Sequence, residues 1–359
     1  MTGDTVGGVW TFTLELAAAL AECGVEVLLA AMGGVPSPSQ RAQAGRIPGL
    51  RLAPSTCKLE WMDDPWDDVA AAGRWLLRLE DEFRPGVVHL NTYGHGALPW
   101  RNPVVLTAHS CVLSWWDAVK GGPLAPRWDR YRREVARSIA AADVLTAPSQ
   151  AMVDCVAAHY GPGLPEYRVV VPNGRSVGQF RPLRKEPFVL TAGRLWDEAK
   201  NVSSVADIAA RLPWPVYLAG AHRGPFGGSH NFEGCSVLGW LPPAEMAAWF
   251  GRASIYALPA RYEPFGLSAL EAALSGCALV LGDIPSLREI WRDAAVYVAP
   301  DDRARLQSAL LELIADPVRR DRIARLAAER AREFTPRRML CGYLKAYRMA
   351  GQRRAACVT

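Results

Sequence analysis

The sequence lacks several features that mark whole classes of protein. Its eight cysteines are scattered and none forms a C-x-x-C pair, which favours reduced, mostly buried thiols. No apolar run approaches the roughly 18 to 20 residues of a membrane-spanning helix, and the opening residues lack the apolar stretch of a signal peptide. We therefore expect a cytoplasmic protein.

Long runs of one charge are also missing. The formal net charge is only +5 over 359 residues, and no basic stretch or familiar module predicts a nucleic-acid groove. This mild positive balance suits small anionic ligands or an anionic membrane surface. We expect no nucleic-acid partner.

What is present is a regular alternation of short apolar segments with segments of helical spacing. Half of the residues are hydrophobic, and the length allows about two domains. Buried strands that alternate with helices predict parallel sheets covered on both faces. The predicted strands span 25–30, 87–90, 104–107, 144–147, 169–171, 188–192, 216–219, 236–238, 255–258, 279–281 and 295–298.

The alternation pauses at a polar, proline-bearing stretch around residues 180–187, which is typical of a linker. We predict two α/β domains in series, over residues 1–183 and 184–335. Ligands of such sheets bind beyond the carboxyl ends of the strands, so the expected site is the cleft between the domains.

The start of the chain departs from this plan. Residues 5–10 resemble the loop that follows a first strand, yet almost no chain precedes them. We expect the first strand of the N-terminal domain to be missing or replaced by another segment. The N-terminal sheet would then have a weakened or exposed edge.

The most informative stretch contains two glutamates. Glu263 falls in a predicted loop, and Glu271 falls one or two turns into the helix that follows. The backbone N–H groups of Phe265, Gly266 and Leu267 would point out of that helix N-terminus, which attracts phosphate. Carboxylates beside a phosphate cradle suit a ligand with phosphates and hydroxyls, such as a nucleotide sugar. A loop and helix with solvated glutamates would give the same pattern.

Cations and a histidine follow other predicted strands. Arg194 and Lys200 flank the loop after Gly193, where arginine acts as a planar fork and lysine as a point charge toward a diphosphate. His109 follows the predicted strand 104–107, so it is also expected at the carboxyl edge of a sheet. Taken singly, Arg194 and Lys200 also fit solvated surface cations, and His109 also fits a structural histidine.

Together these residues resemble a family 4 glycosyltransferase of the GT-B type. The resemblance covers nearly the whole chain, and it rests on the order and spacing of five motifs. They are Gly7-Gly8, His109, the segment 171–174, Gly193-Arg194 with Lys200-Asn201, and Glu263-Pro264-Phe265-Gly266-Leu267 with Glu271. It implies two Rossmann-like, doubly wound domains that face each other across a cleft. A final segment, 336–359, would cross back onto the first domain.

The resemblance also implies roles in the C-terminal domain. Arg194 and Lys200 would bind the donor diphosphate. Glu271 would accept hydrogen bonds from the ribose hydroxyls, and Glu263 would contact the transferred sugar. The N–H groups of the helix start would hold the sugar or the distal phosphate; they belong to Phe265, Gly266 and Leu267.

In the N-terminal domain the resemblance implies fewer contacts. Gly7 and Gly8 would approach the distal phosphate, although a lone glycine pair is not the G-x-G-x-x-G of dinucleotide-binding folds. His109 would lie beside the sugar and help to stabilise positive charge through its neighbouring backbone carbonyl.

The implied activity is retaining transfer of a hexosyl unit from a nucleotide-diphosphate sugar to a hydroxyl acceptor. The acceptor would be a glycan, a lipid-linked sugar or a small molecule, and no metal or other cofactor is expected. The acidic run at 62–68 would then be a solvated helix start rather than a metal site. Two alternatives remain: a phosphorylase-like or synthase-like enzyme on a glucan or disaccharide, and an inactive sugar-nucleotide-binding protein.

Three features do not decide which ligands or surfaces the protein binds. Residues 220–228 are longer and bulkier than the family's glycine-rich turn, so the donor base is not fixed. Trp115 and Trp116 follow His109 closely and suit either acceptor stacking or a core. A basic helix suits either a solvated face or peripheral contact with an anionic membrane; its arginines are Arg127, Arg130, Arg132, Arg133 and Arg137.

Overall fold

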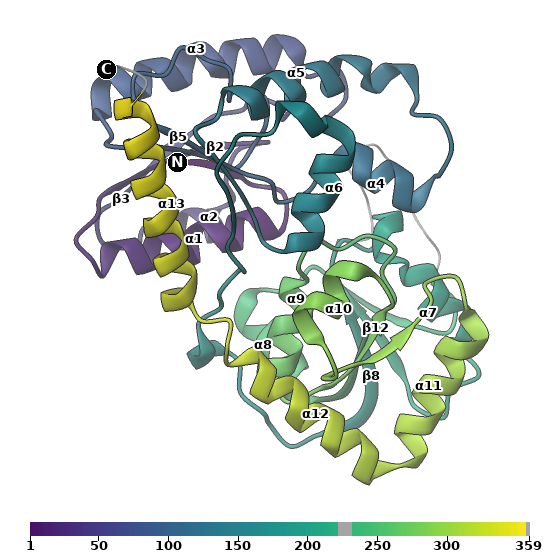
Figure 1. Cartoon of the computed structure of the whole chain (residues 1–359). Coiled ribbons are helices and arrows are strands. Elements are labelled where there is room, and N and C mark those ends of the chain that lie inside the picture. The colour runs from purple at the N-terminus through teal and green to yellow at the C-terminus, as the bar shows by residue number, and fades with distance from the viewer. Residues whose placement is uncertain (222–231, 357–359) are drawn as a thin grey trace. The chain divides into compact units, whose positions relative to one another are not determined.

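The structure is a computed structural model that describes residues 1–221 and 232–356. It divides into two compact α/β units (Figure 1). Unit 1 contains residues 1–117, 122–174 and those from 336 onward, and unit 2 contains residues 118–121 and 175–335. Among the described residues, no helix combines the length and apolar character that crossing a bilayer requires.

Unit 1 is built on parallel strands with helices between them. Its elements are β1 (Thr2–Asp4), α1 (Gly8–Ala21), β2 (Val27–Met32), α2 (Pro38–Ala44), β3 (Leu50–Pro54), α3 (Trp66–Phe83), β4 (Val88–Leu90), β5 (Val104–Thr107), α4 (Val112–Val119), α5 (Asp129–Ala141), β6 (Val144–Ala147), α6 (Gln150–Tyr160), β7 (Arg168–Val170) and α13 (Pro336–Ala356). The strands pair in two sets, β1-β2-β3 and β4-β5-β6-β7. The sets adjoin where the Asn91 backbone N donates to Thr2 Oγ1 and Asn91 Nδ2 donates to Thr2 O, both at 2.7 Å.

The expectation of a missing first strand is wrong. Thr2–Asp4 form β1, pair in parallel with β2 and are buried. The apolar pattern did not reveal this strand because it consists of Thr, Gly and Asp, which hydrogen bonds hold in place. However, β1 has three residues where β2 has six, and an apolar cavity of about 260 Å³ lies beside the amino ends of β2 and β4.

Unit 2 is a second doubly wound sheet. Its elements are β8 (Glu186–Ala192), α7 (Val202–Ala209), β9 (Val216–Ala219), β10 (Ser236–Gly239), α8 (Pro243–Arg252), β11 (Ala253–Leu258), α9 (Leu267–Leu274), β12 (Ala278–Gly282), α10 (Pro285–Trp291), β13 (Val296–Val298), α11 (Arg303–Ala315) and α12 (Pro317–Ala331). The strands lie in the order β10-β9-β8-β11-β12-β13 and are parallel throughout. Successive strands are added on one side of β8 as far as β10 and on its other side from β11 onward, so the strand order reverses between β8 and β11. In open α/β sheets, ligands bind beyond the carboxyl ends of the strands at such a reversal.

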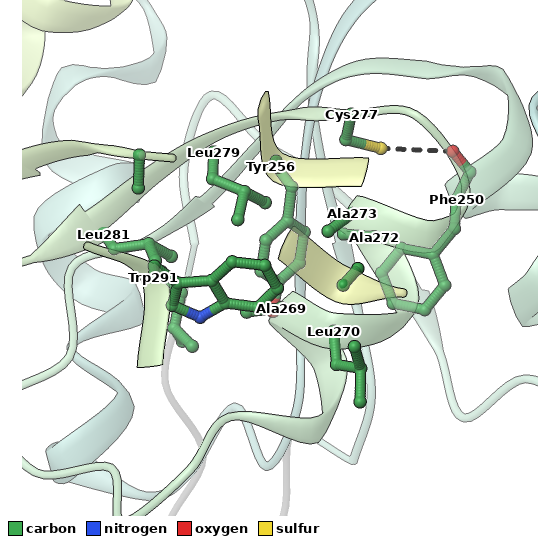
Figure 2. Packing of buried hydrophobic residues seen from close by; sticks show 14 of the residues in the cluster. Phe250, Tyr256, Ala269, Leu270, Ala272, Ala273, Cys277, Leu279, Leu281 and Trp291 are labelled. Carbon is green, nitrogen blue, oxygen red and sulfur yellow. Dashed lines mark hydrogen bonds between the residues drawn. The ribbon is translucent and has the colours of Figure 1, made fainter. Parts of the chain in front are cut away.

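Two apolar cores cover the two faces of this sheet. Every residue of β11 is buried, and successive side chains alternate between faces, so Tyr256 joins one core and Ile255 the other. Figure 2 shows the first core, where Phe250 and Trp291 pack around Tyr256. Cys277 Sγ donates to Phe250 O at 3.2 Å in the same view. A sheet buried on both faces gives the loops at its carboxyl edge a rigid base.

The structural division lies earlier in the chain than the sequence predicted. We expected a boundary after residue 183, whereas the units separate after Gly174. Residues 175–183 belong to unit 2 because Phe180 packs edge-on to Phe250 and Leu183 N donates to Gly251 O at 3.0 Å. In unit 1, α13 runs alongside α1 (Figure 1).

Candidate active site

The loops that follow β8 and β11 meet at the reversal point of unit 2. Arg261 N donates to Ala199 O at 2.8 Å, which joins the two loops through their backbones. On this support Lys200 Nζ donates to Glu263 Oε2 at 2.5 Å. The two side chains are 15% and 12% exposed, so the pair is largely shielded from water. A close, shielded ion pair fixes both charges at the edge where ligands bind.

Glu263 also accepts hydrogen bonds from the backbone just before helix α9. Its Oε1 accepts from Gly266 N at 2.9 Å and from Phe265 N at 3.4 Å. Gly266 has φ +88°, a backbone conformation that side chains disfavour, and it allows the sharp entry into the helix. The predicted N–H donors thus lie together at the helix start, and two of them donate to the carboxylate. Their contact with sugar or phosphate stays a prediction.

Ser286, in helix α10, supports the same loop. Its Oγ donates to the backbone oxygen of Glu263 at 2.5 Å. The hydroxyl therefore fixes the main chain of the residue that carries the carboxylate.

Arg194 lies on the loop that also carries Lys200. Its Nη2 donates to Asp197 Oδ2 at 2.7 Å, and its Cζ lies 5.5 Å from the centre of the Trp196 ring. Asp197 in turn accepts from Ala199 N at 3.0 Å. The Arg194 side chain is 38% exposed, so its guanidinium reaches solvent beside the Lys200 loop. This arrangement presents two cations on one loop, as a diphosphate site requires.

Asn201 has a structural part in this corner. Its φ of +54° lies in the left-handed region, and its Nδ2 donates to Pro259 O at 2.9 Å and Pro300 O at 2.6 Å. The amide thereby ties the start of α7 to the segments that follow β11 and β13. Asparagine tolerates this backbone conformation better than most residues.

Glu271 lies in α9 and pairs with Arg175, a residue outside the sequence motifs. Arg175 Nε donates to Glu271 Oε1 at 2.8 Å, and the side chains are only 11% and 15% exposed. The pair lies within unit 2. Arg175 directly follows the motif at 171–174, which is the only sequence signal that pointed to it.

In unit 1, His109 follows β5 as predicted. Its Nε2 lies 2.8 Å from Asn91 Oδ1, and its ring packs edge-on against Phe12 at 4.4 Å. Because Asn91 Nδ2 donates to Thr2 O, the Oδ1 atom faces His109 and His109 Nε2 carries the proton. Burial lowers the pKa of His109 to about 3, so the ring is neutral at physiological pH.

The predicted glycine pair precedes helix α1. Gly7 is the N-cap of the helix with φ +103°, and Gly8 is its first residue. Val6 N donates to Asp4 Oδ1 at 2.6 Å, which holds the loop against the end of β1. Gly7 and Gly8 therefore stand at the carboxyl edge of the unit 1 sheet.

The structure thus gathers the predicted residues into two sets. Unit 2 holds Arg194, Lys200, Glu263, Phe265, Gly266, Leu267 and Glu271 at one sheet edge, and unit 1 holds Gly7, Gly8 and His109 at another. The convergence of the two sets on one cleft stays a prediction. Residues 222–228 of the altered glycine-rich turn lie outside the described residues. Among the described residues, no group of three or more His, Cys, Asp or Glu side chains is arranged to hold a metal ion.

The remaining candidate surfaces also lie in unit 1. The arginines before and within α5 are exposed, and Trp115 and Trp116 of α4 are half-buried. Membrane contact by the former and sugar stacking by the latter stay predictions.

Comparison with known proteins decides the family. The model for Glycosyltransferase Family 4 matches residues 6–178, and the model for Glycosyl transferases group 1 matches residues 186–316. The chain belongs to glycosyltransferase family 4, of the GT-B type. This glycosyltransferase is 27% identical to a glycogen synthase of Mycobacterium tuberculosis, over 90% of this chain and 86% of the relative. It is 28% identical to a D-inositol 3-phosphate glycosyltransferase of Xylanimonas cellulosilytica, over 99% and 94% of the two chains.

Solved structures agree on the fold. Sucrose-phosphate synthase from Thermosynechococcus elongatus matches with a TM-score of 0.81 and 18% identity, covering 99% of this glycosyltransferase and 96% of that chain. Anabaena HepE in complex with UDP-glucose matches with a TM-score of 0.73 and 17% identity, covering 95% of both chains. At these identities the likeness establishes the GT-B fold and leaves the ligands to be argued from the residues.

Proposed function

We propose that this glycosyltransferase moves a hexosyl unit from a nucleotide-diphosphate sugar to a hydroxyl acceptor, with retention of configuration and without a metal. The observation that carries the proposal is the Lys200–Glu263 ion pair at the reversal point of unit 2, beside the N-terminus of α9. It sets a cation, a carboxylate and helix N–H donors within one small region. A nucleotide sugar offers phosphates to the cation and to the N–H donors, and it offers hydroxyls to the carboxylate.

The chemical demand of the reaction is to stabilise a departing diphosphate. Lys200 and Arg194 supply positive charge on one loop, and preorganised charges of this kind stabilise a transition state without reorganising water. Glu263 holds Lys200 in place and presents its second oxygen to the α9 N-terminus. Glu271 accepts hydrogen bonds from the ribose hydroxyls in this proposal.

The bond changes balance within donor and acceptor. The acceptor oxygen forms a bond to the anomeric carbon, and the bond from that carbon to the diphosphate oxygen breaks. The leaving oxygen takes the acceptor's proton on the same face, so the products are a glycoside and a nucleoside diphosphate. Neutral His109 lies beside the sugar in this proposal, where an uncharged ring adds no repulsion to a positively charged anomeric centre.

A synthase-like reaction on a glucan or sugar phosphate is the second candidate. Two proteins similar to this chain bear the names glycogen synthase and sucrose-phosphate synthase, and another is a D-inositol 3-phosphate glycosyltransferase. These names favour a carbohydrate or a phosphorylated polyol as acceptor.

The test is a transfer assay read by mass spectrometry and NMR. UDP-, GDP- and ADP-glucose are each incubated with the enzyme in chelator, with glucan, glucose 6-phosphate and inositol phosphate as acceptors. We expect one donor to yield a nucleoside diphosphate and a product with the donor's anomeric configuration. Inversion would contradict retention, and activity that appears only with added divalent metal would contradict metal independence.

A further inference from the structure

Arg175 pairs with Glu271 but lies outside the family motifs described above. Arg175 Nε lies 2.8 Å from Glu271 Oε1, and neither side chain is more than 15% exposed. A nearly buried guanidinium therefore contacts the carboxylate that is expected to bind ribose. Charge-assisted bonds of this kind are shorter and stronger than neutral ones and fix the plane of the acceptor.

Arg175 is itself held rigidly. Its Cζ lies 4.8 Å from the centre of the Phe180 ring, so the guanidinium stacks against an aromatic face. Its backbone N donates to Phe334 O at 3.0 Å. These contacts anchor Arg175 where the chain enters unit 2, beside the segment by which the chain leaves it. A rigid donor transmits its position to the carboxylate that it contacts.

Glutamate needs such a support because it has three rotatable side-chain torsions. Glu271 lies within helix α9, so its backbone is fixed, and the bond from Arg175 restricts the rotamers that its carboxylate adopts. An acceptor that is already aimed loses less entropy when it meets hydroxyls.

We propose that Arg175 is a positioning residue, which aims Glu271 at the ribose hydroxyls of the donor nucleotide. The proposal rests on the proposed function, because it assigns Arg175 a part in the same nucleotide site. Arg175 itself makes no contact with the ligand in this role. Its effect therefore depends on the presence of ribose hydroxyls in the ligand.

The experiment compares nucleotides with and without those hydroxyls. The probe is whichever of UDP, GDP and ADP most raises the thermal midpoint, together with its 2′,3′-dideoxy form. Titration calorimetry gives the dissociation constant of each for the wild type, R175Q and R175K. The matched control is R330Q, because Arg330 also stacks on a phenylalanine, pairs with a glutamate and is 13% exposed, but the glutamate is Glu333.

We expect the wild type and R330Q to prefer the ribose form by about tenfold or more, since hydrogen bonds to a charged acceptor are worth that much. R175Q should lower this preference to about threefold or less, with dideoxy binding almost unchanged, and R175K should restore part of it. Equal weakening of both ligands, or an unchanged preference, would overturn the positioning role. Unfolding of both Arg175 variants with R330Q folded would also overturn it, because Arg175 would then be a structural residue.

The outcomes also separate this inference from the function on which it rests. If none of the three diphosphates binds the wild type, the proposed function fails and the positioning role fails with it. If a diphosphate binds and the preference for ribose is the same in R175Q, only the role of Arg175 fails.

Discussion

Lys200 and Glu263 lie 63 positions apart in the chain, yet their side chains meet at 2.5 Å in unit 2. The reason is the strand order, because β8 and β11 are neighbours in the sheet although α7, β9, β10 and α8 lie between them in sequence. Each residue stands in the loop after one of these strands. The pair therefore marks the point at which the sheet reverses and at which ligands of such folds bind.

Removing either member of this pair should abolish most of the activity. We expect K200A and E263A to lower turnover by about a hundredfold or more, since one preorganised charge at a transition state is worth that much. The measurement is kcat with the donor found in the transfer assay. R319A is the control, because Arg319 also pairs with a glutamate, Glu312, but at a site where both are more than a third exposed. Activity near the wild type in K200A and E263A would refute the site.

His109 should remain neutral at every pH at which the enzyme works. Burial lowers its pKa to about 3, and Asn91 Oδ1 accepts a hydrogen bond from its Nε2–H. We expect imidazole NMR signals with Nε2 protonated and no titration between pH 5 and 8. In N91D the new carboxylate should raise the pKa of His109 by about one unit or more, at some loss of stability because Thr2 O loses its donor. A wild-type midpoint near pH 6.5 would contradict this.

His95 should make unit 1 sensitive to mild acid. Its Nε2 donates to Val69 O at 3.1 Å, and burial lowers its pKa to about 4. The unfolded chain, with an ordinary histidine pKa near 6.5, binds a proton that the folded chain does not, so stability falls as pH falls through this window. We expect H95Q, which keeps a donor for Val69 O, to flatten the pH dependence of unfolding between pH 6 and 5 by about 1.4 kcal/mol per pH unit. An identical slope in the wild type and H95Q would count against it.

Lys185 should stabilise unit 2 without taking part in the reaction. Its Nζ donates to the carbonyls of Ser275 at 2.6 Å, Ala253 at 2.8 Å and Phe250 at 3.3 Å, although burial lowers its pKa. K185M would leave these carbonyls without that donor, and we expect a loss of about 2 to 4 kcal/mol in the free energy of unfolding. K58M, at an exposed lysine, serves as the control. Equal denaturant midpoints for the two variants would show that the ammonium is dispensable.

Much of the fold was predictable because buried parallel strands are short apolar runs with little else in them. Each strand expected from the sequence is present within two residues at its ends, from β2 to β13. The strands that escaped prediction are β1 and β3. In β1 hydrogen bonding by Thr2 and Asp4 replaces apolar side chains, and in β3 the residues are only partly buried, so neither gives an apolar run.

The site residues that directly follow strands were predictable from the sequence. The side chains with which they pair were less predictable. Lys200 and Glu263 were expected at one ligand site, but their direct pairing depends on the strand order of unit 2, which no local pattern encodes. Asn91 could have been predicted as a site residue, because it directly follows a predicted strand at the sheet edge that also carries His109. Arg175 could not have been predicted in this way, because the residue with which it pairs, Glu271, lies in a helix far along the chain.

Titration calorimetry of UDP, GDP and ADP against the wild type, K200A and R319A tests the nucleotide site itself. We predict that at least one diphosphate binds the wild type and R319A equally and binds K200A about tenfold or more weakly, because a charge-assisted contact with phosphate is lost. The site assignment would be contradicted if none of the three binds, or if K200A binds as tightly as the wild type.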